Sequence, residues 1–234
     1  MTLSARHSQY QKYSNIYKNT NFETRIAKYT DILSLVNICR NCFPDKAIWQ
    51  APRFYAIKMW EAILSWSNNE TWICSLDGRV SGFIVLVMDH ASFNKEWREQ
   101  RKNFLFAKIL IVILSPKFVL NIIWKKTLAY LRRFKTDKNN LNISELQNKN
   151  RLWIAILAVS PKMRRQGVAK VMITHALKRA IDFGKEAATL MVDIRNRPAR
   201  WLYEKSGFTY KGSDLNYCYY EINLNRKAHK NVAS

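Results

Sequence analysis

The sequence predicts an α+β protein, in which short apolar strands and amphipathic helices build one domain. The first half of the chain contains the pattern strand, helix, helix, hairpin, and the second half contains a strand, a turn and a helix followed by further strands. With 234 residues, of which 48% are hydrophobic, the chain is long enough for one sizeable core plus an insertion or tails. We predict a single domain at residues 21–225, a polar extension at 1–20 and a basic tail at 226–234.

The elements of the first half follow from apolar spacing and from residues that start or stop helices. The predicted elements are, in order, a strand at 23–29, a helix that follows Thr30-Asp31 and ends before Pro44, a helix at 53–66, and strands at 71–76 and 81–88. Asp77-Gly78, between the last two strands, is typical of a tight hairpin turn. These elements form the first part of the predicted sheet and one helical layer.

The second half begins with the most informative stretch of the chain. The apolar run 153–159 predicts a buried strand, and the spacing of apolar residues over 169–181 predicts a helix that ends at Gly184. The turn between them contains Arg164-Arg165-Gln166 and then Gly167. Free N–H groups at a helix start bind anions, and a glycine lets a ligand approach closely. The stretch therefore predicts a pyrophosphate site.

An ordinary turn with basic neighbours is the alternative interpretation of this stretch. The turn lacks the Lys-Ser/Thr pair of a P-loop and a complete Gly-x-Gly-x-x-Gly sequence. The pattern therefore does not indicate a P-loop or a dinucleotide-binding fold.

A second stretch, 196–208, follows another apolar run at 188–192. It reads Asn-Arg-Pro-Ala-Arg-Trp-Leu-Tyr-Glu-Lys-Ser-Gly-Phe. Together with 164–169 it resembles the motifs of the GNAT superfamily of acyl-CoA-dependent N-acetyltransferases, which are Arg/Gln-x-x-Gly-x-Gly/Ala and Asn-x-x-Ala-x-x-Leu-Tyr-x-x-x-Gly-Phe. The resemblance covers 22–89 loosely and 153–223 well. It implies the GNAT fold, a central mixed, mostly antiparallel twisted sheet flanked by helices.

The resemblance also implies an enzyme that transfers an acetyl group from acetyl-CoA, its co-substrate, to a primary amine. In the family, the fourth and fifth strands splay apart and acetyl-pantetheine lies between them. The residues implied to bind the cofactor are Leu157, Ala158, Val159, Arg164, Arg165, Gln166, Gly167, Val168, Ala169 and Asn196. Tyr203 stands where the family places the general acid that protonates the departing thiolate. The alternatives are a core aromatic for Tyr203 and a helix N-cap for Asn196.

The general base is not identified by the resemblance. Many relatives carry a glutamate on the fourth strand, but Trp153 occupies that position here and cannot accept a proton. Asp89, His90 and Asp193 are the candidate bases, and a chain of water molecules is the alternative. The departure leaves the nature of the acceptor open.

The chain also departs from the family at residues 90–151, where a long insertion replaces a short turn. It contains two apolar stretches, Phe104–Leu114 and Phe118–Leu131, with Lys and Arg around them. Neither stretch approaches the roughly 20 residues that a bilayer crossing requires. Two interpretations fit: helices that pack on the sheet or line the acceptor cleft, or an amphipathic element at an anionic membrane surface.

Charge and cysteine content suggest partners and location. The net charge of +22 indicates affinity for nucleic acid, an anionic membrane or a phosphate-bearing substrate. The four cysteines are Cys39, Cys42, Cys74 and Cys218. The Cys39-x-x-Cys42 pair could be half of a zinc site or a redox pair, but no second pair or Cys/His cluster completes it. We therefore favour two structural cysteines on a helix face and predict no metal site. With no secretory signal at the N-terminus, we expect a cytoplasmic protein, at the inner membrane face if the insertion contacts lipid.

The favoured acceptor is an amino group on a nucleotide-linked sugar or another envelope precursor. The alternatives are an amine on a protein or an RNA-associated molecule, and a non-catalytic module that only binds CoA. We expect a monomer or a homodimer.

Overall fold

The computed structural model describes residues 22–46, 48–103 and 150–224. The predicted extension at 1–20, the predicted tail at 226–234 and both apolar stretches of the predicted insertion lie outside the described residues. Within the described ranges, no helix has the length and hydropathy needed to cross a membrane.

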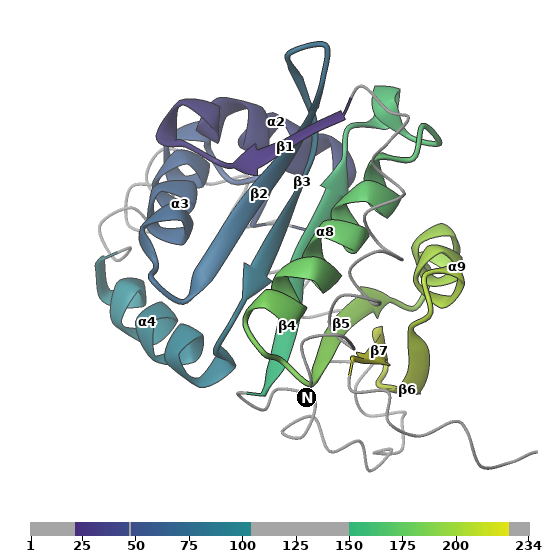
Figure 1. Ribbon diagram of the computed structural model, residues 1–234. Helices are drawn as coiled ribbons and strands as arrows, with labels where there is room; N and C mark the ends of the chain where they lie inside the picture. The colour runs from purple at the N-terminus through teal and green to yellow at the C-terminus, as the bar shows by residue number, and fades with distance from the viewer. Residues whose placement is uncertain (1–21, 47, 104–149, 225–234) are drawn as a thin grey trace, which may run out of the picture.

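A sheet of seven strands forms the centre of the described structure (Figure 1). The strands are β1 (Phe22–Ile26), β2 (Asn69–Leu76), β3 (Arg79–Val87), β4 (Arg151–Val159), β5 (Ala187–Asp193), β6 (Thr209–Ser213) and β7 (Tyr217–Asn223). Their spatial order is β1-β2-β3-β4-β5-β7-β6, and β4–β5 is the one parallel pair among these strands. The sheet is mixed and mostly antiparallel, which confirms the predicted fold class.

Helices cover both faces of the sheet. They are α2 (Ile32–Cys42), α3 (Arg53–Ser65), α4 (His90–Asn103), α8 (Val168–Asp182) and α9 (Arg197–Lys205), with 3-10 turns η2 (Tyr29–Asp31) and η3 (Pro161–Met163). Side chains of β3 alternate between the faces: Ile84 and Leu86 pack with α8, whereas Phe83 and Val85 pack with α2 and α3. A strand buried on both faces explains the nearly continuous apolar run in its sequence.

The first strand is shorter than predicted, because a local ion pair redirects the chain. β1 ends at Ile26, and Tyr29–Asp31 forms a 3-10 turn instead of continuing the strand. The carboxylate of Asp31 accepts hydrogen bonds from Arg25 at 2.8 Å and from the backbone N–H of Lys28 at 2.7 Å. Asp31 is the N-cap of α2, but its side chain makes no capping bond because these donors already occupy it.

The described part of the predicted insertion is a helix that packs against the domain. The ring of Trp66, at the end of α3, meets Phe93 and Trp97 of α4 edge-on, with centroid distances of 4.9 and 5.6 Å. Such pairs favour a fixed position for the helix. The two interpretations of the apolar stretches concern residues outside the described ranges, so both stay predictions.

Gly82 allows β3 to lie close to the backbone of β4 and to the Val168 side chain at the start of α8. It lies on β3 opposite Val159 of β4, beneath the start of α8. A Cβ atom here would lie 2.8 Å from the carbonyl oxygen of Ala158 and 3.0 Å from Cγ1 of Val168. Because the first neighbour is backbone, a methyl group could be accommodated only by moving the strand or the helix.

Candidate active site

The centre of the sheet opens where β4 and β5 part. Their parallel ladder pairs four residues and ends at Ile154 opposite Leu190. Beyond that point, among the described strands, β4 continues to Val159 paired with β3 alone, and β5 continues to Asp193 paired with β7 alone. Figure 1 shows the two strands diverging. The edge of β4 that faces β5 thus has backbone groups outside any ladder over 155–159.

A β-bulge marks the point of separation. Leu86 pairs with Ile154 and Val85 with Ile156, which leaves Ala155 as an additional residue on β4. A bulge bends its strand and increases the local twist. The bulge therefore accounts for the departure of β4 from β5.

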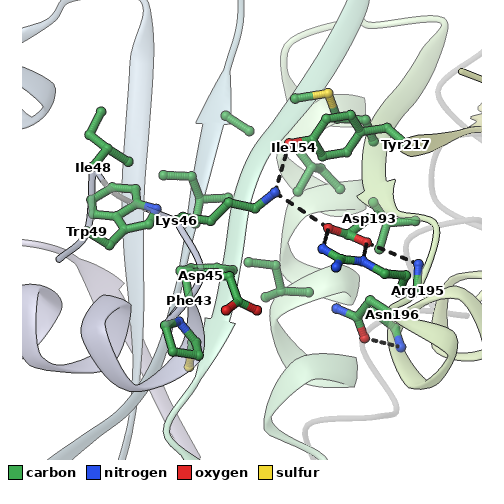
Figure 2. Close-up of a pocket in the computed structure, with 18 of the residues that line it drawn as sticks. Phe43, Asp45, Lys46, Ile48, Trp49, Ile154, Asp193, Arg195, Asn196 and Tyr217 are labelled. Atoms are coloured by element: carbon green, nitrogen blue, oxygen red, sulfur yellow. Dashed lines mark hydrogen bonds and ion pairs between the residues drawn. The ribbon is translucent and has the colours of Figure 1, made fainter. Parts of the chain in front are cut away.

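A pocket of about 610 Å³ lies in this separation (Figure 2). Its walls come from the loop after α2, the separated parts of β4 and β5, the start of α9 and the start of β7. The lining residues are Cys42, Phe43, Pro44, Asp45, Lys46, Ile48, Trp49, Ile154, Ala155, Ile156, Leu157, Met191, Val192, Asp193, Arg195, Asn196, Ala199, Tyr203 and Tyr217. Phe43 and Trp49 belong to the core under α2 and α3, whereas Tyr203 belongs to the core under α8. The pocket therefore connects the two faces of the sheet.

The predicted pyrophosphate site, the anion cradle formed by residues 164–169, lies just beyond the end of β4. Gly167 is the N-cap of α8 in the left-handed conformation, with φ of 92°. A Cβ atom on it would have no protein atom within 4 Å, so the space above it is open. The first N–H groups of α8, from Val168 and Ala169, have no acceptor within the helix. Glycine is needed here for its positive φ, and the open space allows an anion to approach these groups.

Both predicted arginines of the cradle are exposed. Arg164 Nη2 lies 3.8 Å from Sγ of Cys42, which in turn donates to the carbonyl oxygen of Val159 at 3.1 Å. Arg165 has a φ of 61°, in the left-handed region. The Gln166 side chain donates to the carbonyl oxygen of Lys162 at 3.4 Å. Both arginine side chains are thus exposed at this loop, and that of Arg164 extends toward Cys42 at the end of α2.

Helix α9 brings Tyr203 and Asn196 to the pocket. Tyr203 is 7% exposed, packs against Phe208 and Tyr220, and lines the pocket. Burial raises the pKa of the Tyr203 phenol, so the hydroxyl stays protonated at neutral pH. The side-chain oxygen of Asn196 accepts from the N–H of Ala199 at 3.2 Å. Asn196 is therefore a helix N-cap that also lines the pocket, and the two interpretations of this residue coexist.

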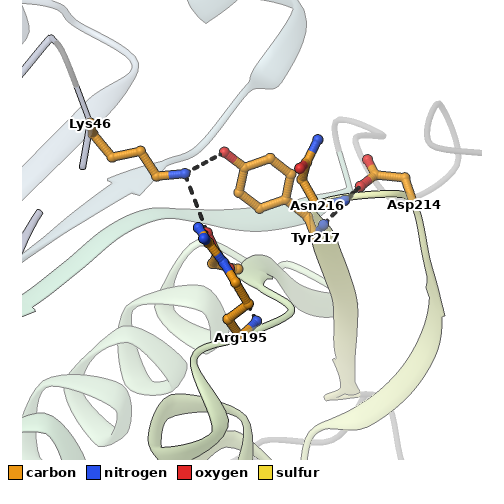
Figure 3. A network of polar contacts seen from close by, with 6 residues as sticks. Lys46, Arg195, Asp214, Asn216 and Tyr217 are labelled. Carbon is orange, nitrogen blue, oxygen red and sulfur yellow. Dashed lines mark hydrogen bonds and ion pairs between the residues drawn. The ribbon is translucent and has the colours of Figure 1, made fainter. Parts of the chain in front are cut away.

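A polar network crosses the other end of the pocket (Figures 2 and 3). Lys46, in the loop after α2, donates to the Tyr217 hydroxyl at 2.9 Å and lies 3.5 Å from Oδ2 of Asp193. Arg195 holds both carboxylate oxygens of Asp193 at 3.0 Å. Asp214 accepts from the N–H groups of Tyr217 and Asn216, and so fixes the turn that carries Tyr217. Segments distant in sequence therefore meet over the gap between β4 and β5.

Comparison with known proteins finds a family profile in the second half of the chain. The profile described as the Acetyltransferase (GNAT) family matches residues 124–208, which include the cradle and α9. The matched segment is less than half of the chain, but it contains both predicted motifs and lies in a chain with the GNAT fold. These findings support an acetyl-CoA-dependent N-acetyltransferase. A search of curated protein sequences finds no match.

Solved structures of acetyltransferases share the fold of this chain. PaiA N-acetyltransferase from Thermoplasma acidophilum, solved with coenzyme A, is 13% identical with a TM-score of 0.54, over 86% of this chain and 98% of that chain. Ribosomal-protein-S18-alanine N-acetyltransferase from Escherichia coli is 11% identical with a TM-score of 0.53, over 91% and 99%. The spermidine/spermine N-acetyltransferase SpeG from Vibrio cholerae is 12% identical with a TM-score of 0.52, over 87% and 94%.

The candidate bases of this acetyltransferase lie in different places. Asp193 lines the pocket, but its hydrogen bonds with Arg195 outweigh burial and lower the pKa of its carboxyl group to about 2. Asp89 and His90 lie after β3, where His90 meets the ring of Trp153 at 5.8 Å, and none of these three lines the pocket. Burial lowers the pKa of His90. The structure thus brings only Asp193 to the pocket, as the partner of two cations.

Sequence reasoning missed the residues between α2 and α3 that face the pocket. Asp45, Lys46 and Trp49 follow the predicted helix stop at Pro44, and nothing in their spacing indicates a site. Tyr217 was predicted only as part of a strand. Their proximity depends on long-range pairing of the sheet, which local patterns do not encode.

Proposed function

We propose that the acceptor of this acetyltransferase is the amino group of an amino sugar or another envelope precursor. The observation that supports this class is the aromatic wall of the pocket, formed by Phe43, Trp49 and Tyr217 beside polar groups. A sugar ring has an apolar face of C–H groups and a polar rim, which suits an aromatic surface next to hydrogen-bonding side chains. A volume of about 610 Å³ accommodates one sugar and the acetylated end of the donor.

The acetyl donor is assigned to the α8 and α9 side of the gap. The free edge of β4 at Leu157, Ala158 and Val159 would pair with the pantetheine amides. The N–H groups of 166–169 would hold the diphosphate, with ionic contacts from the arginines at 164–165. The open space above Gly167 and the exposure of this loop fit such a group. Asn196 would bond to the donor in addition to capping α9.

Transfer requires an amine, a thioester and a route for two protons. The neutral amine attacks the carbonyl carbon, a C–N bond forms, and the C–S bond breaks. The nitrogen loses a proton to solvent, and we assign Tyr203 to donate a proton to the departing sulfur. Its raised pKa keeps the phenol protonated in advance of each turnover. Tyr203 then regains a proton from solvent.

The acceptor is tested by measuring release of free thiol from acetyl-CoA with a panel of amines. The panel contains free and nucleotide-linked amino sugars, peptides with a free N-terminus, and polyamines. We expect the highest kcat/KM for an amino sugar. Equal or better transfer to a peptide would overturn the proposed acceptor while leaving the acetyltransferase assignment intact.

The net charge of +22 supports a second candidate acceptor, an amine on a protein or an RNA-associated molecule. Retention on RNA that weakens with salt, without retention on anionic liposomes, would select it. The opposite result would support contact with the inner membrane face. We propose a cytoplasmic location, because all four cysteines are free thiols.

A further inference from the structure

The pocket holds a primary amine of the protein itself. Lys46 is the one lysine among the described residues that line it. Its side chain extends across the pocket toward Tyr217 and Asp193, as Figure 2 shows. Nζ lies 2.9 Å from the Tyr217 hydroxyl, 3.5 Å from Oδ2 of Asp193 and 4.9 Å from the centre of the Tyr217 ring. These three contacts hold an ammonium group at a defined place.

Lys46 reaches the pocket from the side opposite the cradle. The loop that carries it follows α2, on one face of the sheet, whereas the cradle begins α8 on the other face. The separation of β4 and β5 joins the two sides through the pocket. The inference rests on the proposed function, in which the thioester enters this gap from the α8 side. An amine on the α2 side then faces it, as an acceptor amine would.

We propose that Lys46 is a site of self-acetylation, where the enzyme transfers an acetyl group from acetyl-CoA to its own ε-amine. Lys46 first loses a proton to water, and the neutral nitrogen attacks the thioester carbonyl. The new bond is the amide C–N bond of acetyl-lysine, and the bond that breaks is C–S. The proton that Tyr203 donates makes the CoA thiol. Acetyl-CoA is the only co-reactant, and no oxidant or reductant is needed.

The charged groups around Lys46 determine how this reaction depends on pH. Burial lowers its pKa, but the Tyr217 hydroxyl and the Asp193 carboxylate outweigh burial, and the net pKa is raised. Asp45 neighbours Lys46 in the chain, and Arg195 lies on the far side of Asp193. At neutral pH Lys46 is therefore an ammonium ion, and the rate rises about tenfold per pH unit while the neutral amine remains a minor species.

Acetylation also changes the pocket that Lys46 crosses. Acetyl-Lys46 carries no charge, so the ion pair with Asp193 and the cation–π contact with Tyr217 are lost. Asp193 keeps Arg195 as its partner. The modified side chain can therefore leave the network without exposing an unpaired carboxylate.

The test incubates the full chain with acetyl-CoA and no added amine, and follows the Lys46 peptide by mass spectrometry between pH 7 and pH 9. We expect Lys46 to be acetylated at least about tenfold faster than Lys58, which is exposed on α3, because the pocket places the reactants together. The rate constant should not change on tenfold dilution of the protein. Lys46→Arg removes the modification, and the matched control Lys58→Arg leaves the Lys46 rate unchanged.

Each alternative outcome has a separate meaning. Acetyl-CoA binding by calorimetry and transfer to an added amine, without acetylation of Lys46 above the Lys58 rate, overturns the inference alone. Absence of acetyl-CoA binding overturns the inference and the proposed donor site together. Acetylation of Lys46 that slows on dilution indicates transfer between molecules and contradicts self-acetylation. Tyr203→Phe should slow the reactions of Lys46 and of the added amine by the same factor.

Discussion

The two halves of β4 have the same apolar character and opposite roles. From Arg151 to Ile154 the strand is paired on both edges, with β3 and with β5. From Ala155 to Val159 its partner among the described strands is β3 alone, and Ala155, Ile156 and Leu157 line the pocket. Leu152 is 0% exposed, whereas Leu157 is partly exposed and lines the pocket. One strand thus supplies a core position in its first half and a binding wall in its second.

The difference shows that apolar side chains alone do not decide which part of a strand is core. The bulge at Ala155 and the end of the ladder at Ile154 decide it, because they determine whether the second edge has a backbone partner. Changes in the paired half should therefore alter stability. Changes around the separated half should alter binding and turnover.

Substitutions in the anion cradle, which follows the separated half of β4, should have the largest effect on acetyl-CoA binding. We expect Gly167→Glu to weaken acetyl-CoA binding about a thousandfold, because a carboxylate would face the diphosphate and any side chain strains a φ of 92°. Calorimetric titration measures the change. Gly184→Glu is the matched control, since Gly184 also has a positive φ and open space but ends α8 far from the cradle. Equal losses in both variants would attribute the effect to backbone strain.

In the paired half, Leu152→Ala should lower the free energy of unfolding by about 2 to 5 kcal/mol, since it leaves a cavity in the core. Leu157→Ala should cost less stability but raise KM for acetyl-CoA. Denaturant unfolding and steady-state kinetics of the two variants measure both effects. The comparison between the halves is wrong if the two variants exchange these results.

Tyr203→Phe should lower kcat about a hundredfold while the affinity for acetyl-CoA is kept, since only the proton donor is lost. Tyr220→Phe is a suitable control, because that hydroxyl donates to Glu204 at 2.7 Å and Tyr220 does not line the pocket. Stopped-flow or steady-state thiol release gives kcat for both. A loss of affinity in Tyr203→Phe would instead favour a packing role.

The α8 side of the sheet should lose stability in mild acid. Burial, together with Arg179 and Lys178, lowers the pKa of His175 to about 4, against 6.5 for an ordinary histidine. Because the unfolded state binds the proton more tightly, stability is complete above pH 6.5 and falls as the pH drops toward 4. The expected loss between pH 7 and pH 5 is about 2 kcal/mol. Denaturant titrations measure it, and His175→Gln should remove most of this pH dependence.

Local sequence patterns predicted most of the elements and the family. The apolar runs, the hairpin at Asp77-Gly78 and the turn at Gly167 each depend on neighbouring residues, so the sequence carries their signals directly. The end of β1 was wrong because the ion pair between Arg25 and Asp31 overrides strand propensity. The Lys46 network was missed because its members are joined only by the pairing of the sheet. The assigned roles of Tyr203 and the cradle residues stay predictions.

The glycine on β3 has a consequence for the cradle that lies across from it. A side chain at position 82 would meet the Ala158 carbonyl and the Val168 side chain, so glycine there lets the first turn of α8 lie close to the sheet. The position of the leading amides of α8 therefore depends in part on a residue far upstream in the chain. Experiments on the affinity for acetyl-CoA should therefore include substitutions of Gly82 as well as substitutions in the cradle loop.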